Sequence, residues 1–143
     1  MSLKAVQEAI ERAMSVVKAA ADPIRLDLPL PGPDYERFHL STGDPVLWRS
    51  EETSQGKKVR FRALGPGKSI IGYHEHRSAE ILIAESGVLF YGVGGEKRAL
   101  LPRETYTSQP HQLHYAEFQG PGEATVQWPD LEGDSIDVSF FPS

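Results

Sequence analysis

The stretch YHEHRSAEILIAESG, from Tyr73 to Gly87, places two histidines one residue apart and a glutamate shortly after them, within an otherwise apolar run. Alternate residues of a β-strand share one face, so the side chains of His74 and His76 are expected to project together. Glu80 has the same parity and joins them if the chain turns at Arg77-Ser78. Three titratable groups on one buried face are costly unless a cation pairs with them, which favours a metal site.

A further ligand has to come from another strand. His114 opens the segment HYAEF, in which Ala116 and Phe118 are expected to share its face. His111 is the competing candidate, and its parity places it on the opposite face unless Pro110 introduces a turn. Strand parity favours His114 as the ligand. For His111, a role at the substrate or simple exposure on the surface stays open.

Three imidazoles and one carboxylate suit Fe, Mn, Ni, Co or Zn as a divalent ion and leave one or two positions for water or substrate. The chain has no cysteine, so disulfides, thiolate catalysis and sulfur-ligated metal sites are excluded. The alternative is that His74 and His76 are ordinary structural residues. The metal hypothesis is favoured because Glu80, a strand-closing Gly87 and His114 fall into one pattern with them.

The rest of the chain reads as short strands. With 143 residues, 13 glycines and 11 prolines, it suits one domain rich in turns. Apolar and polar residues alternate in segments 58–64 and 135–141, as in strands with one buried face. Residues 87–101 read as a hairpin that turns at Gly94-Gly95, and residues 114–128 read as a second hairpin that turns at GPGE. Roughly eight strands without interleaved helices predict a sandwich or barrel.

The N-terminal third differs from this pattern. Residues 3–20 repeat apolar positions at helical spacing, with Ser2 as the expected N-cap, and the run ends before Pro23. Proline-rich residues 22–45 read as an extended arm. We therefore expect residues 1–45 to form a helix and arm that pack on a barrel formed by residues 46–143.

Charge and hydropathy limit the classes of partner that the chain is expected to bind. The net charge of −5 argues against nucleic acid as a partner. No apolar run approaches the ~20 residues of a membrane span, so we expect no membrane contact and a soluble, cytoplasmic protein. With Glu80 and Leu82 facing inward, Ile81, Ile83 and Val88 leave the outer face of the same strand apolar. Either the N-terminal helix or a second copy in a homodimer is expected to cover that face.

The segment HEHRSAEILIAESG has the pattern H-x-H-x3-E-x6-G and resembles the first signature of the cupin superfamily. The resemblance covers residues 57–141. It implies a mainly β fold, a single cupin-type β-barrel or jelly roll, here with an N-terminal helix. It also implies that His74, His76, Glu80 and His114 are the metal ligands.

Within the cupins, the segments QPHQLH and WPDL are similar to the small bacterial branch that includes dimethylsulfoniopropionate lyases. Those enzymes carry a tyrosine two residues after the glutamate, where this chain has Leu82. Because an isobutyl group cannot take a proton, the resemblance argues against that reaction. Tyr91 on the next strand is the candidate for a phenol in the metal pocket, with core packing as the alternative. Trp128 is expected to be a packing residue.

The leading hypothesis is a metal-dependent enzyme that acts on a small polar molecule inside the barrel, with Glu80 and Tyr91 as the candidate catalytic residues. Oxygenase chemistry is slightly favoured over lyase or isomerase chemistry, since the sequence shows no clear proton-transfer base. The alternative is a non-catalytic sensor that binds a metal or a small ligand.

Overall fold

The computed structural model describes residues 2–16, 23–93 and 96–141 of the chain. These residues form one helix and eleven strands, which confirms the mainly β class with an N-terminal helix. The elements in chain order are α1 (Leu3–Val16), β1 (Ile24–Pro29), β2 (Glu36–Arg37), β3 (Thr42–Gly43), β4 (Val46–Thr53), β5 (Gly56–Ala63), β6 (Lys68–Glu75), β7 (Glu80–Val93), β8 (Glu96–Leu100), β9 (Thr105–Ser108), β10 (His114–Gln127) and β11 (Ser135–Phe140).

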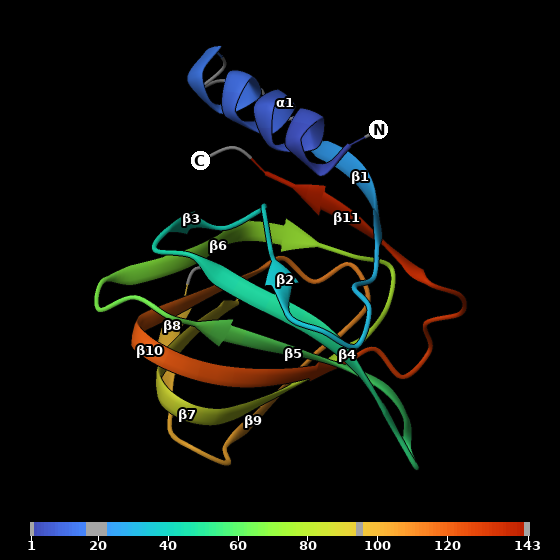
Figure 1. Ribbon diagram of the computed structural model, residues 1–143, viewed down its shortest axis with the longest axis vertical. Helices are drawn as coiled ribbons and strands as arrows, with labels where there is room; N and C mark the ends of the chain where they lie inside the picture. Colours follow the sequence, from blue (N-terminus) through green and yellow to red (C-terminus); the bar gives the residue numbers. More distant parts are fainter. Residues whose placement is uncertain (1, 17–22, 94–95, 142–143) are drawn as a thin grey trace.

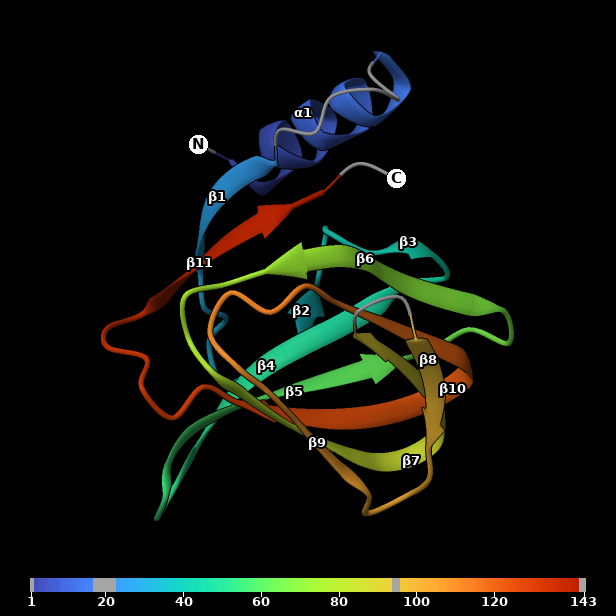
Figure 2. The same ribbon diagram turned by 180° about the vertical axis from the view of Figure 1, so that it is seen from behind.

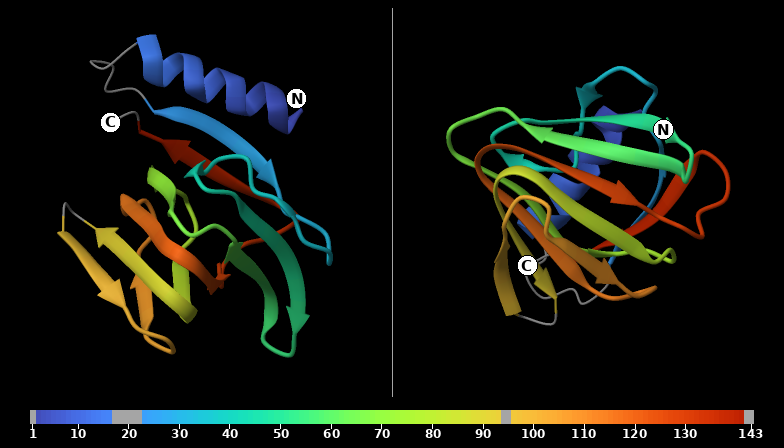
Figure 3. Two further views of the ribbon diagram at one scale, coloured as in Figure 1. Left: turned by 60° about the vertical axis from the view of Figure 1, so that its left-hand side comes forward. Right: turned by 90° about the horizontal axis from the view of Figure 1, so that it is seen from below.

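The strands form one antiparallel sheet that curls into a barrel (Figures 1 and 2). Its main path runs β1-β11-β6-β10-β5-β4-β2, while β7 pairs with β10 and carries β8 and β9 on its other edge. The view from below in Figure 3 shows the strands wrapping around a common interior. The inward side chains of this curled sheet make up most of the core.

Strand β10 is the centre of the sheet, and its length shows that one prediction from the sequence was wrong. Residues 114–128 were expected to form a hairpin, but β10 continues from His114 to Gln127. Its first half pairs with β6 and its second half with β5, while β7 pairs along both halves. A bulge between Gln119 and Glu123 lets one strand serve both partners, since Gly120 has a φ of 85° and Pro121 needs no ladder partner.

Strand β7 runs further than the sequence suggested. Gly87 was expected to close it, but the strand continues to Val93. Its last part, from Leu89 to Val93, pairs with β8, as predicted for that hairpin. The expected turn at Gly94-Gly95 lies outside the described residues. Gly87 has a φ of 81°, and a Cβ there would lie 2.3 Å from the carbonyl oxygen of Pro121. The residue type is therefore set by the close approach of β10 at the bulge.

The helix lies at one end of the molecule, and the arm runs from there along the sheet to β4 (Figure 1). The backbone N–H of Ala5 donates to the Ser2 hydroxyl, so the predicted N-cap is confirmed. The predicted residues 17–20 of the helix lie outside the described part of the chain. The expected arm contains β1, which pairs with β11 along its length, and two short strands, β2 and β3. Figure 1 shows α1 over β1, at the far end from β7, so the helix does not cover the apolar outer face of β7.

The outer face of β10 carries a buried carboxylate. Only 2% of the side chain of Glu117 is exposed, and it accepts hydrogen bonds from the hydroxyl of Tyr115, the amide of Gln119 and the ammonium of Lys97 on β8. The three donors outweigh the effect of burial, which alone would raise the pKa, and lower the pKa of Glu117 to about 2. This cluster links β8 to the outer face of β10, the strand that carries His114 on its inner face.

No helix among the described residues is long and apolar enough to cross a membrane.

Candidate metal centre

Three histidines from two neighbouring strands meet inside the barrel. His74 lies near the end of β6, His76 follows that strand directly, and His114 is the first residue of β10. His74 and His114 are cross-strand partners in the β6–β10 ladder, which sets their rings 4.1 Å apart between centroids. The ring of His76 lies 4.8 Å from that of His114. The candidate ligand atoms of the three imidazoles all lie within 4.8 Å of one another.

Each imidazole is oriented by its own backbone. The Nδ1 atoms of His74, His76 and His114 lie 2.7, 2.6 and 2.8 Å from the carbonyl oxygens of Gly72, Ser78 and Gln112 respectively. A carbonyl oxygen can only accept, so in all three rings Nδ1 carries the hydrogen. The Nε2 atoms are thereby left to face the interior. This is the arrangement that metal-binding histidines use, with the distal N–H fixed by a hydrogen bond.

Glu80 opens β7 and lies against two of the histidines. Its Oε1 is 3.1 Å from Nε2 of His76, and its Oε2 is 3.5 Å from Nε2 of His114. The turn after β6 that the sequence placed at Arg77-Ser78 makes this approach possible. Tyr91 on the same strand donates a hydrogen bond to Oε2 over 2.9 Å. The structure thus brings together the four residues that the sequence singled out as ligands.

Burial and charge set the protonation of this cluster. Burial lowers the pKa of His74 to about 3 and lowers that of His114, so both rings are neutral at pH 7. For His76 burial also lowers the pKa, but the hydrogen bond and charge of Glu80 outweigh it and raise the pKa. For Glu80 burial raises the pKa, but the hydrogen bond and the charge of His76 outweigh it and hold the pKa well below its usual range. The cluster therefore contains two neutral imidazoles, those of His74 and His114, beside an ionised carboxylate that is hydrogen-bonded to His76.

The donor set fits a divalent cation. Nε2 of His114 is buried and has no hydrogen-bond partner, although a carboxylate oxygen of Glu80 lies 3.5 Å away. Because Nδ1 of His114 carries the hydrogen, two atoms with lone pairs face each other across this gap. A buried pair of this kind is unfavourable unless a positive charge lies between or beside them. A metal ion bound by these atoms supplies that charge.

The competing histidine lies elsewhere. His111 has a φ of 60°, and 62% of its side chain is exposed. Its Nδ1 is 3.7 Å from a carboxylate oxygen of Glu75, and its backbone N–H donates to the carbonyl of His76. Pro110 does introduce the turn that the sequence allowed for, and the turn directs His111 to the surface, away from the three clustered rings.

Comparison with known structures identifies the architecture. No family model and no curated protein matches the sequence. An RmlC-like cupin from Shewanella frigidimarina NCIMB 400 superimposes with a TM-score of 0.52 at 14% identity, over 78% of this chain and 85% of that one. A predicted oxalate decarboxylase from Thermotoga maritima gives 0.52 at 15% identity, over 75% and 91%. An acetylacetone dioxygenase from Acinetobacter johnsonii gives 0.51 at 16% identity, over 64% and 65%.

The chain has the cupin fold. The cupin barrel encloses a cavity of about 60 Å³ that reaches from the histidine cluster into the core. Tyr91 lines this cavity, so its phenol lies beside the candidate metal site. Burial and the adjacent carboxylate of Glu80 raise the pKa of this phenol, which therefore stays protonated at neutral pH.

Trp128 is the residue whose role in the cupin site the sequence analysis missed. It follows β10, and its indole N–H donates a hydrogen bond to Oε1 of Glu80 over 3.1 Å. The two residues are 48 positions apart, so no local spacing connects them. The WPDL segment, which supported the resemblance to lyases, was the signal that pointed to this position. Together with Tyr91, Trp128 fixes the orientation of the carboxylate.

An outer cleft of about 370 Å³ adjoins the cupin barrel on the other side of Trp128. It lies between the tip of the β4–β5 hairpin and residues 128–134. Across it, Nζ of Lys57 is 3.2 Å from a carboxylate oxygen of Asp134, and the amide of Gln127 donates to the carbonyl of Gln55. The indole lines both the cleft and the inner cavity, so it forms a wall that the two spaces share.

Proposed function

We propose that this protein is a metal-dependent enzyme that binds one divalent transition-metal ion through His74, His76, His114 and Glu80. The observation that carries the proposal is the shared orientation of the three imidazoles. Each holds its Nδ1 hydrogen on a backbone carbonyl and directs Nε2 inward, and Nε2 of His114 is buried without a hydrogen-bond partner. When bound, such an ion supplies a Lewis acid and open coordination positions at the end of the cavity.

The residues around the ion have separate tasks in this proposal. Glu80 contributes its negative charge, which the low pKa of the group maintains at neutral pH. Trp128 and Tyr91 are positioning residues, because each donates a hydrogen bond to one oxygen of that carboxylate. The barrel wall keeps water away from the ion on the core side, since the cavity is lined mainly by apolar side chains.

The reaction that we propose is of the oxygenase type. Proton abstraction needs a general base, and the groups of the described cavity are poorly suited to that task. The phenol of Tyr91 has a raised pKa and donates to Glu80, while the imidazoles offer Nε2 to the ion. Glu80 itself is hydrogen-bonded through both oxygens. Lyase or isomerase chemistry would need Glu80 to leave these partners, so it ranks second.

Metal analysis tests the first half of the proposal. Protein purified without chelators should contain close to one equivalent of a divalent transition metal. His76→Ala and His114→Ala should each lose it, while His111→Ala, at the exposed histidine, should retain it. If all three variants retain the metal, the proposed set of ligands is wrong.

Oxygen consumption tests the second half. The iron-loaded protein should consume oxygen with one or more members of a panel of diols, thiols, diketones and carboxylates. Binding of metal and small ligands without turnover for any ion or substrate would contradict the enzyme proposal. The site would then serve as a non-catalytic sensor.

A further inference from the structure

All but one of the polar side-chain groups that line the cavity lie at one end, beside the histidine cluster. Around the proposed ion, its polar groups are the three imidazoles, the carboxylate of Glu80, the phenol of Tyr91 and the indole N–H of Trp128. The lining residues carry one further polar group, the indole N–H of Trp48, which is buried beside Phe38 and Phe61 without a hydrogen-bond partner. Away from that end, the wall consists of aliphatic and aromatic side chains such as those of Phe61, Leu82 and Phe118. The sequence suggested a polar substrate, but apart from the single indole N–H of Trp48 this wall offers polar contacts only to the part of a ligand that touches the metal end.

No lysine, arginine or aspartate is among the described residues that line the cavity. The nearest arginines of β5 point to the opposite face of the sheet, where Arg60 and Arg62 both bind Glu123 at 2.9 and 2.6 Å. Lys97 is likewise held outside, by Glu117. A charged group pushed into the apolar part would lose its hydration without gaining a charged partner, which is strongly unfavourable.

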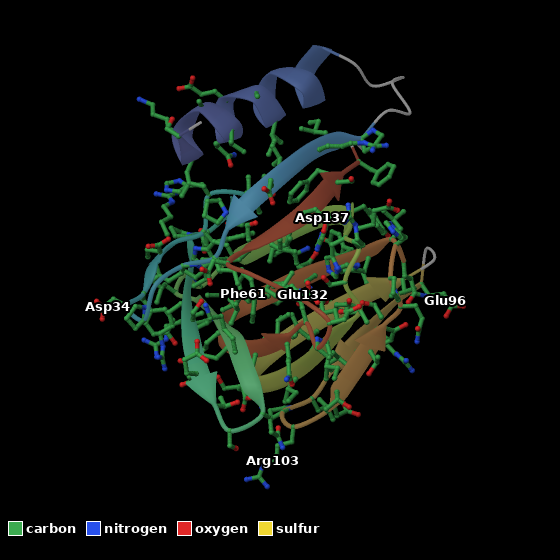
Figure 4. All side chains as sticks on the ribbon, turned by 90° about the vertical axis from the view of Figure 1, so that its right-hand side faces the viewer. Asp34, Phe61, Glu96, Arg103, Glu132 and Asp137 are labelled. Atoms are coloured by element: carbon green, nitrogen blue, oxygen red, sulfur yellow. The ribbon has the colours of Figure 1, made fainter. Side chains whose placement is uncertain are left out.

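Among the charged side chains labelled in Figure 4, those of Asp34, Glu96 and Arg103 extend outward at the rim of the molecule. This agrees with the segregation of charge from the barrel interior.

The size of the cavity limits the body of the ligand. One water molecule needs roughly 10–15 Å³ of such space. The cavity volume of about 60 Å³ therefore holds a group of about four to six non-hydrogen atoms.

We propose that the substrate has two parts: one oxygen-bearing chelating head that reaches the metal, and one short, uncharged, apolar body that fills the inner cavity. This inference rests on the proposed function, because the head needs the ion. It predicts that small neutral or monoanionic chelators with hydrocarbon bodies bind well. Dicarboxylates, sugar acids and phosphates should bind poorly, because their second polar end would lie against Phe61 and Phe118.

Two hydroxamates of equal size test the inference on the Co²⁺-loaded protein. 4-Methylpentanohydroxamic acid ends in an isopropyl group, and N-hydroxysuccinamic acid ends in a carboxylate of the same shape, while both carry the same head. Acetohydroxamic acid supplies the head alone. The visible absorption of Co²⁺ reports whether a head reaches the ion, and calorimetry gives each Kd.

We expect all three heads to perturb the Co²⁺ spectrum, and the isopropyl probe to bind at least about 100-fold more tightly than the carboxylate probe. Ala124→Leu should fill the cavity, because Ala124 is buried in its wall. It should weaken the isopropyl probe at least about tenfold and leave acetohydroxamic acid unchanged. Ala99→Leu, at an exposed position of β8, is the matched control and should change neither.

The outcomes separate the two proposals. Failure of the protein to bind Co²⁺, or unchanged Co²⁺ binding in His114→Gln, overturns the proposed function. If Co²⁺ binds but acetohydroxamic acid does not, or the two longer probes bind equally, the inference about the substrate is overturned. It is also overturned if Ala124→Leu leaves the isopropyl probe unaffected, since the body of the ligand then lies outside the cavity.

Discussion

Replacement of Glu117 by glutamine should remove a defined, pH-dependent part of the stability of the barrel. The carboxylate is buried behind β10, and its hydrogen bonds lower its pKa to about 2 in the folded protein, against an ordinary value of 4.5. One pKa unit corresponds to about 1.4 kcal/mol, so the difference is worth about 3 kcal/mol. Because the pKa is lowered on folding, this stabilisation is complete above pH 4.5 and is lost as the pH falls from there towards 2.

Urea unfolding of the metal-free protein at several pH values between 7 and 2.5 measures this term. Other carboxylates also titrate in this range, so the relevant quantity is the difference in unfolding free energy between the wild type and Glu117→Gln. That difference should shrink by up to about 3 kcal/mol between pH 7 and 2.5, whatever its value at pH 7. Glu132→Gln, at an exposed position, is the control and should follow the wild type throughout. A difference that stays constant with pH would refute the reasoning.

Three further predictions concern the site, the bulge and the core. His114→Gln should weaken the binding of Zn²⁺ or Co²⁺ by at least about 100-fold in calorimetry, since mutation of the residues that hydrogen-bond to metal ligands already lowers metal affinity by about 10–100-fold. His111→Gln is the control and should change the affinity by less than about threefold. Gly87→Ala should lower the unfolding free energy by more than about 2 kcal/mol, because φ is 81° and a backbone oxygen would lie 2.3 Å from the new Cβ. Gly32→Ala is the control. A Cβ at Gly32 meets nothing within 4 Å, so this substitution should change the unfolding free energy by less than about 0.5 kcal/mol. Phe118→Ala should cost about 3–5 kcal/mol in urea unfolding, because the ring is 2% exposed in the core, and a loss below about 1 kcal/mol would contradict the packing described.

Strand alternation was sufficient to predict most of the candidate site. The spacing of His74 and His76 places them on one face, and the parity of the HYAEF segment selected His114 over His111. These inferences succeeded because a two-residue period fixes the face of a side chain wherever the strand is regular. The same period also predicted that Glu80 would return to this face after a turn.

The interpretation of GPGE as a hairpin turn failed for an identifiable reason. Glycine and proline allow both a turn and a bulge, and only the pairing partners decide between them. Because β10 passes from β6 to β5 along one edge, the chain bends at Gly120 and continues. This depends on contacts with strands far away in the sequence, which local patterns do not contain.

The role of Trp128 and the burial of Glu117 were also beyond local patterns. The indole reaches Glu80 from the far end of β10, and Lys97 reaches Glu117 from β8. In each case a long side chain forms a hydrogen bond with a residue on another strand. Alternation alone identifies the face of a residue, but not the partner that it meets there.

The wall formed by Trp128 has a practical consequence. The chain has only two tryptophans, and the other, Trp48, is buried in an aromatic cluster with Phe38 and Phe61. Indole emission responds to polarity and to nearby ions with partly filled d shells, so Trp128 is an intrinsic fluorophore beside the proposed metal centre. In a Trp48→Phe background, the arrival of an ion or a ligand would be visible as a change in the colour or intensity of a single emitter, without any added label.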